Sequence, residues 1–237
     1  MRFTLMQQPF QNALRAVGGA LSPRNMIPAL AGIHLEAKGS HVILRATDLE
    51  HAIRLELPAT VVAEGAVVLP GRHLVELVRR LPPAEIAVSV DPGNSTARIL
   101  CADSDFTVHG LAPDQFPPDP VPGEERVTID TGAVRTLLRE TGFAVAHDES
   151  RPWFTGVHLV IRGEAAEAMA TDSAVLAYSR VVVANPFDLA MAVIIPGRSV
   201  QELSQLLAGE DAERCDMIPV HNQLLFRFGA LTLTTRL

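Results

Sequence analysis

A strand-like apolar run meets a helical pattern in the stretch Val67-Val68-Leu69-Pro70-Gly71-Arg72-His73-Leu74-Val75-Glu76-Leu77-Val78-Arg79-Arg80-Leu81. Leu74, Leu77, Val78 and Leu81 follow the i, i+3, i+4, i+7 spacing of a helix with one apolar face. The opposite face carries three arginines and one glutamate. The stretch therefore predicts a strand, a Pro-Gly junction and an amphipathic helix.

The same order returns further along the chain, in Val193-Ile194-Ile195-Pro196-Gly197-Arg198-Ser199-Val200-Gln201-Glu202-Leu203-Ser204-Gln205-Leu206-Leu207. Two shorter segments also recur, both at a constant offset: Gly32-Ile33-His34-Leu35 returns as Gly156-Val157-His158-Leu159, and Ala46-Thr47-Asp48 as Ala170-Thr171-Asp172. Self-similarity at one spacing is the sequence signature of repeated structural units. The chain is predicted to be a duplication.

Each half reads as strand, helix, strands, helix and strands. In the second half, Asp130 is a predicted N-cap for a helix with Val134, Leu137, Leu138 and Val145 on its apolar side. Such an order favours α+β domains, each with two helices packed on antiparallel sheets, over a βαβ design. The predicted strands of the first half are 3–5, 32–37, 41–46, 52–57, 66–69, 85–90, 97–101 and 105–111.

A proline-rich segment separates the halves. Prolines stand at positions 113, 117, 118, 120 and 122, a density that neither a helix nor a central strand tolerates. We place the domain boundary there, giving domains of residues 1–120 and 121–237.

Composition limits the function classes. The 237 residues are 48% hydrophobic and carry a formal net charge of −7. This charge argues against a protein that coats nucleic acid with its whole surface, but permits a local basic face. Cys101 and Cys215 are too few for a disulfide framework and are expected as reduced, partly buried thiols. We expect a cytoplasmic protein because no signal peptide or membrane-length apolar run is visible.

No pattern for catalysis stands out. The sequence has no phosphate-binding glycine loop, no zinc-protease motif, no paired cysteines and no nucleophile elbow. His34 and His158 occupy equivalent strand positions, which favours a structural role over metal binding. The repeated Asp48 and Asp172 indicate a repeated turn or cap. We therefore expect no catalytic residue, metal or cofactor, and rank an enzyme with an unrecognised site third.

The polar faces of the four predicted helices remain as candidate functional surfaces. They hold seven arginines against four carboxylates, although the whole chain is acidic. One interpretation is four ordinary solvated faces, which this signal alone slightly favours. The other is a single surface that meets phosphates without reading bases. The arginines are Arg15, Arg72, Arg79, Arg80, Arg135, Arg139 and Arg198.

The chain resembles the bacterial β sliding clamp family, the processivity subunit of DNA polymerase III. The tandem units, the Thr-Asp after a strand, Asp114-Gln115-Phe116-Pro117 in the linker and the duplicated Pro-Gly-Arg helix carry the resemblance, which runs from Met1 to Leu237. A family chain has three such domains, and two chains close a ring with helices lining the hole. The resemblance implies a non-catalytic factor that encircles double-stranded DNA, is opened by a clamp loader and tethers DNA polymerase.

Matching positions imply site residues. Arg24, Arg72, Arg79, Arg198 and Trp153 correspond to DNA-facing positions. The family's partner cleft starts at an Arg-aromatic-aromatic-Leu segment, here Arg151-Pro152-Trp153-Phe154, and continues through Thr171-Asp172-Ser173-Ala174-Val175-Leu176. Within this cleft the expected residues are Arg151, Phe154, Thr171, Asp172 and Leu176, while the family's Gly, His and Arg are replaced.

The family's third domain has no counterpart in these residues, so two sheet edges are expected to lack a partner, 105–111 and 174–183. An apolar edge strand is a ready template for pairing with another chain. Head-to-tail pairing of three two-domain chains would again give six domains, and a trimeric ring is our hypothesis. The expected oligomer contacts are Phe106, Val108, Tyr178, Val181 and Val183.

The alternative is a clamp-like protein-interaction module that binds clamp loader or polymerase without encircling DNA. The weak charge of the helices and the altered cleft favour it. Neither interpretation involves a membrane.

Overall fold

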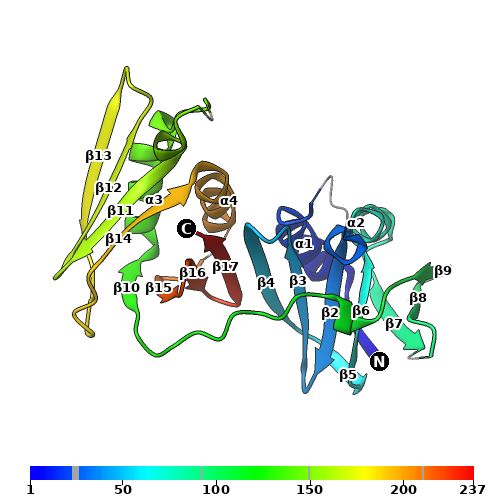
Figure 1. Ribbon diagram of the computed structural model, residues 1–237. Helices are drawn as coiled ribbons and strands as arrows, with labels where there is room; N and C mark the ends of the chain where they lie inside the picture. The colour runs from blue at the N-terminus through cyan, green and yellow to red at the C-terminus, as the bar shows by residue number, and fades with distance from the viewer. Residues whose placement is uncertain (23–26, 92, 149, 210) are drawn as a thin grey trace. The chain divides into compact units, whose positions relative to one another are not determined.

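The structure, a computed structural model, describes residues 1–22, 27–91, 93–148, 150–209 and 211–237 (Figure 1). The chain divides into two compact units, Met1–Asp119 (unit 1) and Pro120–Leu237 (unit 2). Each unit holds two α-helices that pack against each other and against antiparallel strands. The predicted α+β class is confirmed.

Unit 1 begins with a strand that leads directly into a helix, as the sequence predicts. Its elements are β1 (Arg2–Met6), α1 (Gln7–Gly18), the 3₁₀ turn η1 (Pro28–Ala31), β2 (Gly32–Lys38), β3 (His41–Thr47), β4 (His51–Pro58), β5 (Thr60–Ala63), β6 (Gly65–Pro70), α2 (Gly71–Arg80), β7 (Glu85–Asp91), β8 (Thr96–Cys101), β9 (Ser104–His109) and η2 (Pro113–Gln115).

Unit 2 repeats this order with small changes. Its elements are β10 (Val127–Asp130), α3 (Thr131–Thr141), η3 (Gly142–Ala144), η4 (Pro152–Phe154), β11 (Gly156–Arg162), β12 (Ala165–Thr171), β13 (Leu176–Val182), β14 (Met191–Pro196), α4 (Gly197–Ala208), β15 (Arg214–Val220), β16 (Gln223–Phe228) and β17 (Leu231–Arg236).

The strand orders of the two units match. In unit 1 the neighbours run β5-β1-β7-β8-β9 and β4-β3-β2-β6, and in unit 2 they run β10-β15-β16-β17 and β13-β12-β11-β14. Apolar side chains alternate inward along these strands, so Phe3 and Leu5 of β1 are buried and Phe3 meets the Phe10 ring edge-on at 6.5 Å. The predicted duplication is therefore confirmed in topology.

One strand of unit 1 has no full counterpart. β5 pairs with β1 through Thr4↔Thr60 and Phe3↔Val61. At the equivalent place in unit 2 only the bridge Thr128↔Ala184 forms, within the part of the chain that the structure describes. Pro186 follows shortly after and has no backbone N–H to continue the ladder. Our sequence analysis missed β5.

The duplicated Pro-Gly junction has a steric reason. A Cβ on Gly71 would lie 2.6 Å from the Leu21 side chain and 3.2 Å from the Ala31 carbonyl oxygen. A Cβ on Gly197 would lie 2.8 Å from Val145 and 3.0 Å from the Thr155 carbonyl oxygen. Both helices thus begin where the backbone of a neighbouring segment passes too closely for a side chain.

The glycine of the other repeated segment has the same role. A Cβ on Gly32 would lie 3.0 Å from the Leu69 carbonyl oxygen, and a Cβ on Gly156 would lie 2.4 Å from that of Ile195. Each contact is with backbone, which cannot move aside as a flexible side chain can. The glycine therefore lets β2 and β11 pair closely with the strands that precede α2 and α4.

The end of unit 1 is fixed by the Asp-Gln-Phe-Pro segment. Phe116 is buried, its ring centroid 5.3 Å from that of His34, and the Arg45 guanidinium lies 5.4 Å above the Phe116 ring. Asp119 binds Arg45 at 3.2 Å and Arg54 at 3.5 Å. Burial and the neighbouring Arg45 charge lower the pKa of His34 to about 4, so this histidine is neutral at pH 7.

Four sequence-based boundaries need correction. The edge segment predicted as 174–183 is β13, Leu176–Val182. The helix predicted to include Val145 ends at Thr141, where Gly142 begins a 3₁₀ turn. Leu21 lies outside α1, which ends at Gly18. The edge strand predicted as 105–111 is β9, Ser104–His109, because Leu111 instead bridges Val68.

Candidate functional site

The helix pair of unit 1 is joined by a buried polar contact. The side chain of Gln7 is buried, and its Nε2 donates to the Val78 carbonyl oxygen at 2.8 Å and to Gln11 Oε1 at 2.9 Å. This contact ties the first turn of α1 to the last turns of α2. Phe10 and Leu14 of α1 and Leu74 of α2 are fully buried beneath the pair, so the remaining helix faces are free to present polar groups.

Four predicted DNA-facing arginines of unit 1 are exposed on these helices: Arg15 on α1, and Arg72, Arg79 and Arg80 on α2. Glu76 binds Arg79 at 2.6 Å and lies 3.9 Å from Arg80. These pairs are exposed and therefore weak, and water or a phosphate can compete for the guanidinium groups. The helix surface of unit 1 retains a net positive charge.

The helix surface of unit 2 is less basic. Arg135 Nε and Nη2 donate to the Leu207 carbonyl oxygen at 3.0 and 2.6 Å, near the end of α4, where a cation complements the helix dipole. Arg139 is exposed and lies 3.9 Å from Glu140, and Arg198 is exposed in the first turn of α4. Arg135, predicted to face DNA, is therefore at least partly committed to holding α3 against α4.

Two further predicted DNA contacts are Arg24 and Trp153. Arg24 lies outside the described residues. Trp153, in η4, is 77% exposed, an unusual state for the only tryptophan of the chain. This exposure leaves most of the ring accessible to a partner in the part of unit 2 that the structure describes.

The predicted cleft residues come together in unit 2. Arg151 Nη1 donates to Ser173 Oγ at 2.8 Å, which joins η4 to the turn between β12 and β13. Thr171 Oγ1 closes that turn on the Val175 carbonyl oxygen at 2.7 Å. Phe154 is half-buried beside them, while Leu176 is 71% exposed at the start of β13.

The side chain of Asp172 stabilises this turn through hydrogen bonds to its backbone. Its Oδ1 accepts the backbone N–H groups of Ala174 and Val175 at 2.9 and 2.8 Å, and these hydrogen bonds lower the pKa of its carboxyl group. The repeat in unit 1 is built alike, with Asp48 Oδ1 accepting from Glu50 and His51 N–H. The predicted repeated turn is confirmed, and the carboxylate of Asp172 has a structural task there.

In unit 1 the imidazole of His51 also contacts this turn, a contact that the sequence pattern did not predict. His51 Nδ1 lies 3.1 Å from Asp48 Oδ1, and His51 Nε2 lies 3.2 Å from the Gly19 carbonyl oxygen. Burial favours a neutral Asp48, yet the hydrogen bonds from His51 dominate and lower the pKa of Asp48 to about 2. The spacing Thr-Asp-x-x-His was the available signal, and it marks a turn that anchors the end of α1.

The predicted oligomer contacts fall on true sheet edges. β9 and β13 each end their sheet order, and Phe106 of β9 is 41% exposed with Val108 half-buried. On β13, Tyr178 is 52% exposed and Val181 half-buried. Val183, however, is buried within unit 2, so its side chain does not reach the surface as predicted.

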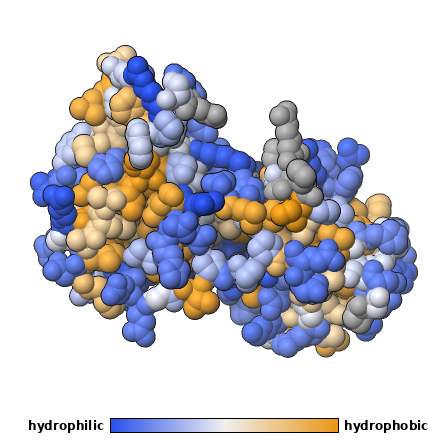
Figure 2. Space-filling view, in the orientation of Figure 1, coloured by the Kyte–Doolittle hydropathy of each residue, from blue (hydrophilic) through white to orange (hydrophobic). Residues whose placement is uncertain are grey.

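Strand alternation would have identified the exposed side of β13. Leu176, Tyr178, Arg180 and Val182 lie on one face, and Val182 is 79% exposed. Figure 2 shows apolar surface over the part of unit 2 that contains β12, β13 and β14. An exposed apolar edge of this kind indicates a surface for another polypeptide.

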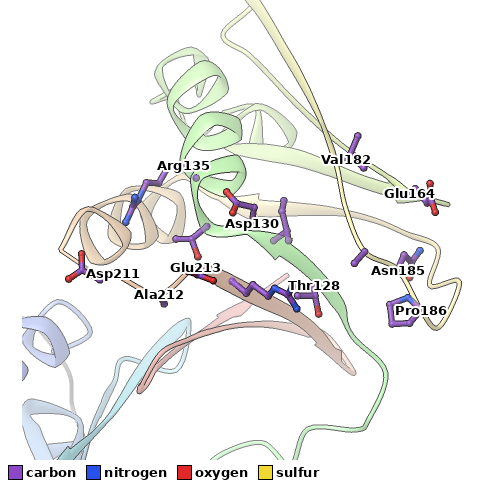
Figure 3. Close-up of a pocket in the computed structure, with 15 residues that line it drawn as sticks. Thr128, Asp130, Arg135, Glu164, Val182, Asn185, Pro186, Asp211, Ala212 and Glu213 are labelled. Carbon is purple, nitrogen blue, oxygen red and sulfur yellow. The ribbon is translucent and has the colours of Figure 1, made fainter.

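A cavity of about 1110 Å³ surrounds the start of α3 in unit 2. Figure 3 shows Asp130 and Glu213 near the start of α3, Asp211 beside α4 and Glu164 on the far side. Carboxylates outnumber the arginines of its lining, and Asp130 already caps α3 by accepting the Ala133 N–H at 3.2 Å. The cavity is therefore a poor site for phosphates.

The described residues offer little for metal or thiol chemistry. Within them no group of three or more His, Cys, Asp or Glu side chains can hold a metal ion. Cys101 and Cys215 are free and buried, and burial raises the pKa of Cys215 to about 12, which disfavours the thiolate. No helix in the described part of the chain is long and apolar enough to span a membrane.

Comparison with known sequences follows the division into units. A family model described as the DNA polymerase III beta subunit, N-terminal domain, matches residues 1–120, and its central-domain counterpart matches residues 128–237. Beta sliding clamps of Staphylococcus epidermidis and Staphylococcus aureus are 34% and 33% identical over 246 aligned residues. The alignment covers the whole of this chain but 64% of each relative.

Comparison with solved structures also identifies sliding clamps. The DNA polymerase sliding clamp of Bacillus subtilis superposes with a TM-score of 0.93 at 30% sequence identity, covering all of this chain and 64% of that one. The beta subunit of Streptococcus pyogenes gives 0.92 at 26% identity with the same coverage. The chain thus spans a little under two thirds of the length of the proteins that it matches.

Proposed function

The chain belongs to the DNA polymerase III beta subunit family, and on that premise we propose that it acts as a sliding clamp. In this role it encircles duplex DNA without reading its sequence and tethers a DNA polymerase, which raises processivity. It performs no chemistry itself and works in the cytoplasm. Its partners are double-stranded DNA, the polymerase and the clamp loader.

The helix surface of unit 1 carries this proposal. Arg15, Arg72, Arg79 and Arg80 are exposed on two packed helices of an otherwise acidic chain. Guanidinium groups on rigid helices contact phosphates without base specificity, as sliding requires. Arg139, Arg198 and Trp153 are the exposed contributions that we assign to unit 2, and Arg24 completes the set.

We assign polymerase and loader binding to the surface formed by Arg151, Phe154, Thr171 and Leu176. Arg151 is held by Ser173, and Leu176 offers an exposed apolar contact beside it. Asp172 positions the turn through its backbone hydrogen bonds. A partner peptide with apolar side chains suits this surface, since exposed apolar area is what it supplies.

We assign ring assembly to the edges β9 and β13. Phe106, Val108, Tyr178 and Val181 are the contacts, and the exposed Val182 replaces the buried Val183 of our sequence-based set. Pairing of these edges between copies gives a homo-oligomeric ring. Light scattering at micromolar concentration tests this: an oligomer is expected, and a monomer contradicts it.

A retention assay distinguishes the clamp from its alternative. The protein is loaded by its clamp loader onto nicked circular duplex, and the complex is isolated and then cut once with a restriction enzyme. A clamp stays on the circle and leaves within minutes of cutting because it slides off the ends. Equal loss from circular and linear DNA overturns the proposal.

The second candidate is a clamp-like interaction module that binds polymerase or loader without encircling DNA. The observation in its favour is the helix surface of unit 2, where Arg135 is bonded to Leu207 and Arg139 lies beside Glu140. Such a module binds partner proteins equally well with and without DNA. It shows no difference between circular and linear templates.

A further inference from the structure

Three exposed arginines gather on one face of the sheet β10-β15-β16 in unit 2. Arg214 is in β15, Arg227 is in β16 and Arg126 immediately precedes β10. Strand alternation places them opposite the buried side chains of Ile129 and Cys215, which point into the core. The arginines therefore lie on the sheet face that does not contact the core of unit 2.

These arginines line a pocket of about 350 Å³, together with Thr128, Asp216 and the end of β16. That volume is at the lower end of the range of small-molecule sites, roughly 300–1,000 Å³. The pocket is separate from the cavity at the start of α3, although Thr128 and Arg214 border both.

Only one carboxylate lines the pocket. Asp216 accepts a hydrogen bond from Thr128 Oγ1 at 2.7 Å and lies 3.8 Å from Arg126 Nε. Arg214 and Arg227 make no ion pair within the residues that the structure describes. Asp130, which pairs with Arg214 across the strands, caps α3 and is not among the residues that line the pocket. Three guanidinium groups and one carboxylate leave a net charge of about +2.

The fold itself does not require this cluster. In the matching register of unit 1, Glu85, Ala87 and Leu100 stand where unit 2 has Arg214, Asp216 and Arg227. The scaffold is therefore built equally well without these charges. Arg214 and Arg227 are therefore additions to a repeated framework, whereas Arg126 has an exposed counterpart in Arg2 of unit 1.

We propose that this pocket binds the phosphomonoester group of a small ligand of nucleotide size. A phosphomonoester carries between −1.5 and −2 charges near pH 7, which matches the net charge of the pocket. Planar guanidinium groups donate paired hydrogen bonds to such oxyanions. The inference does not rest on the proposed clamp function, because the site lies on strands and not on the helix surface.

Isothermal titration calorimetry with the full chain tests the proposal. The probes are inorganic phosphate and a nucleoside 5′-monophosphate, with the matching nucleoside as a neutral reference. Saturable binding of the monophosphate, absent for the nucleoside, is expected. Arg214→Gln and Arg227→Gln should each weaken it about three- to tenfold, whereas Arg162→Gln, an exposed arginine elsewhere in unit 2, should leave it unchanged.

Asp216→Asn separates a binding role from a structural one. The amide can still accept the Thr128 hydrogen bond, but the competing negative charge is gone. Monophosphate binding should tighten about threefold, a gain that a merely structural residue would not give. Circular dichroism checks that each variant is folded.

Three results overturn the proposal. One is the absence of saturable binding of both phosphate probes. Another is equal weakening by Arg162→Gln. The third is tighter binding of a glutamate-rich or phosphoserine peptide than of the monophosphate, which would make the pocket a docking site for an acidic protein segment.

Discussion

The two units join their helices with the same kind of polar contact but with different side chains. In unit 1 the neutral Gln7, supported by Gln11, donates to Val78. At the position of Gln11, unit 2 has Arg135, which donates to Leu207, and at the position of Gln7 it has Thr131. Thr131 Oγ1 is buried without a hydrogen-bond partner among the described residues.

This difference shows that an arginine on a helix is not always available to a ligand. Arg135 neutralises the end of α4 and holds the helices together, whereas the arginines of α2 project outward. The positive charge that we propose for DNA contact therefore comes mainly from unit 1. Four experiments can break or sharpen this contrast.

Truncating a core leucine should destabilise the two units to a similar extent, because each helix pair packs on a fully buried leucine. Leu74→Ala in α2 and Leu203→Ala in α4 should each lower the free energy of unfolding by about 2–5 kcal/mol. Urea denaturation of both variants measures this. A loss below about 1 kcal/mol in only one unit would show that its helix pair is loosely packed.

The stabilising effects of the Asp48 turn and the Asp172 turn should depend differently on pH. The folded-state pKa of Asp48 is about 2 against an ordinary 3.8, so its contribution is present above about pH 4 and is lost as pH falls through 2. This contribution is about 2 kcal/mol. Unfolding free energies between pH 5 and pH 2 should fall less steeply in Asp48→Asn.

The exposed counterpart Asp172 provides the control. Asp172→Asn should change the acid dependence much less, because water screens its hydrogen bonds. Equal effects of the two substitutions would contradict the role assigned to the buried His51 contact.

The polar groups between the helices of each unit can be removed by substitution. Gln7→Ala should lower the free energy of unfolding by about 1 kcal/mol, because a buried hydrogen bond to Val78 is lost. Thr131→Val should be neutral or slightly stabilising, because the hydroxyl that it removes makes no hydrogen bond to any described residue. Thermal unfolding of both variants measures the difference. A strongly destabilised Thr131→Val would reveal a partner for that hydroxyl.

The smallest effects concern DNA. Arg79→Gln should weaken duplex binding a few-fold and reduce the slope of log affinity against log salt by about one, as expected for one lost phosphate contact. Arg135→Gln should change this slope less. It should instead lower the free energy of unfolding, because the Arg135 guanidinium donates to the Leu207 carbonyl oxygen. Fluorescence anisotropy at several salt concentrations measures both. Identical slopes for the two variants would remove the contrast between the units.

Periodicity was sufficient for much of the fold. The spacing of Leu74, Leu77 and Val78 predicted α2, and the repeats predicted the duplication. The pattern missed β5, since Thr60–Ala63 is short and largely exposed, and strand propensity depends on such context. It also placed Val145 in α3, although the helix ends at Thr141.

The candidate site was less predictable for a physical reason. A helical pattern shows which residues are polar but not which of them bond to a neighbouring helix, so Arg135 and Arg139 read alike. Only the packing of α3 against α4 separates them. The buried state of Val183, in contrast, follows from alternation along β13 and its continuation, in which Ala177, Ser179 and Val183 are buried.

The central claim is that the helix surface, and not the strand surface, meets DNA. A photoreactive amino acid at position 79 on α2 or at position 98 on β8, both exposed in unit 1, tests it on covalently closed circular duplex loaded with the protein. Crosslinks to DNA from position 79, with little or no yield from position 98, are the predicted result. Equal yields from both positions, or crosslinks from position 98 alone, would contradict the account.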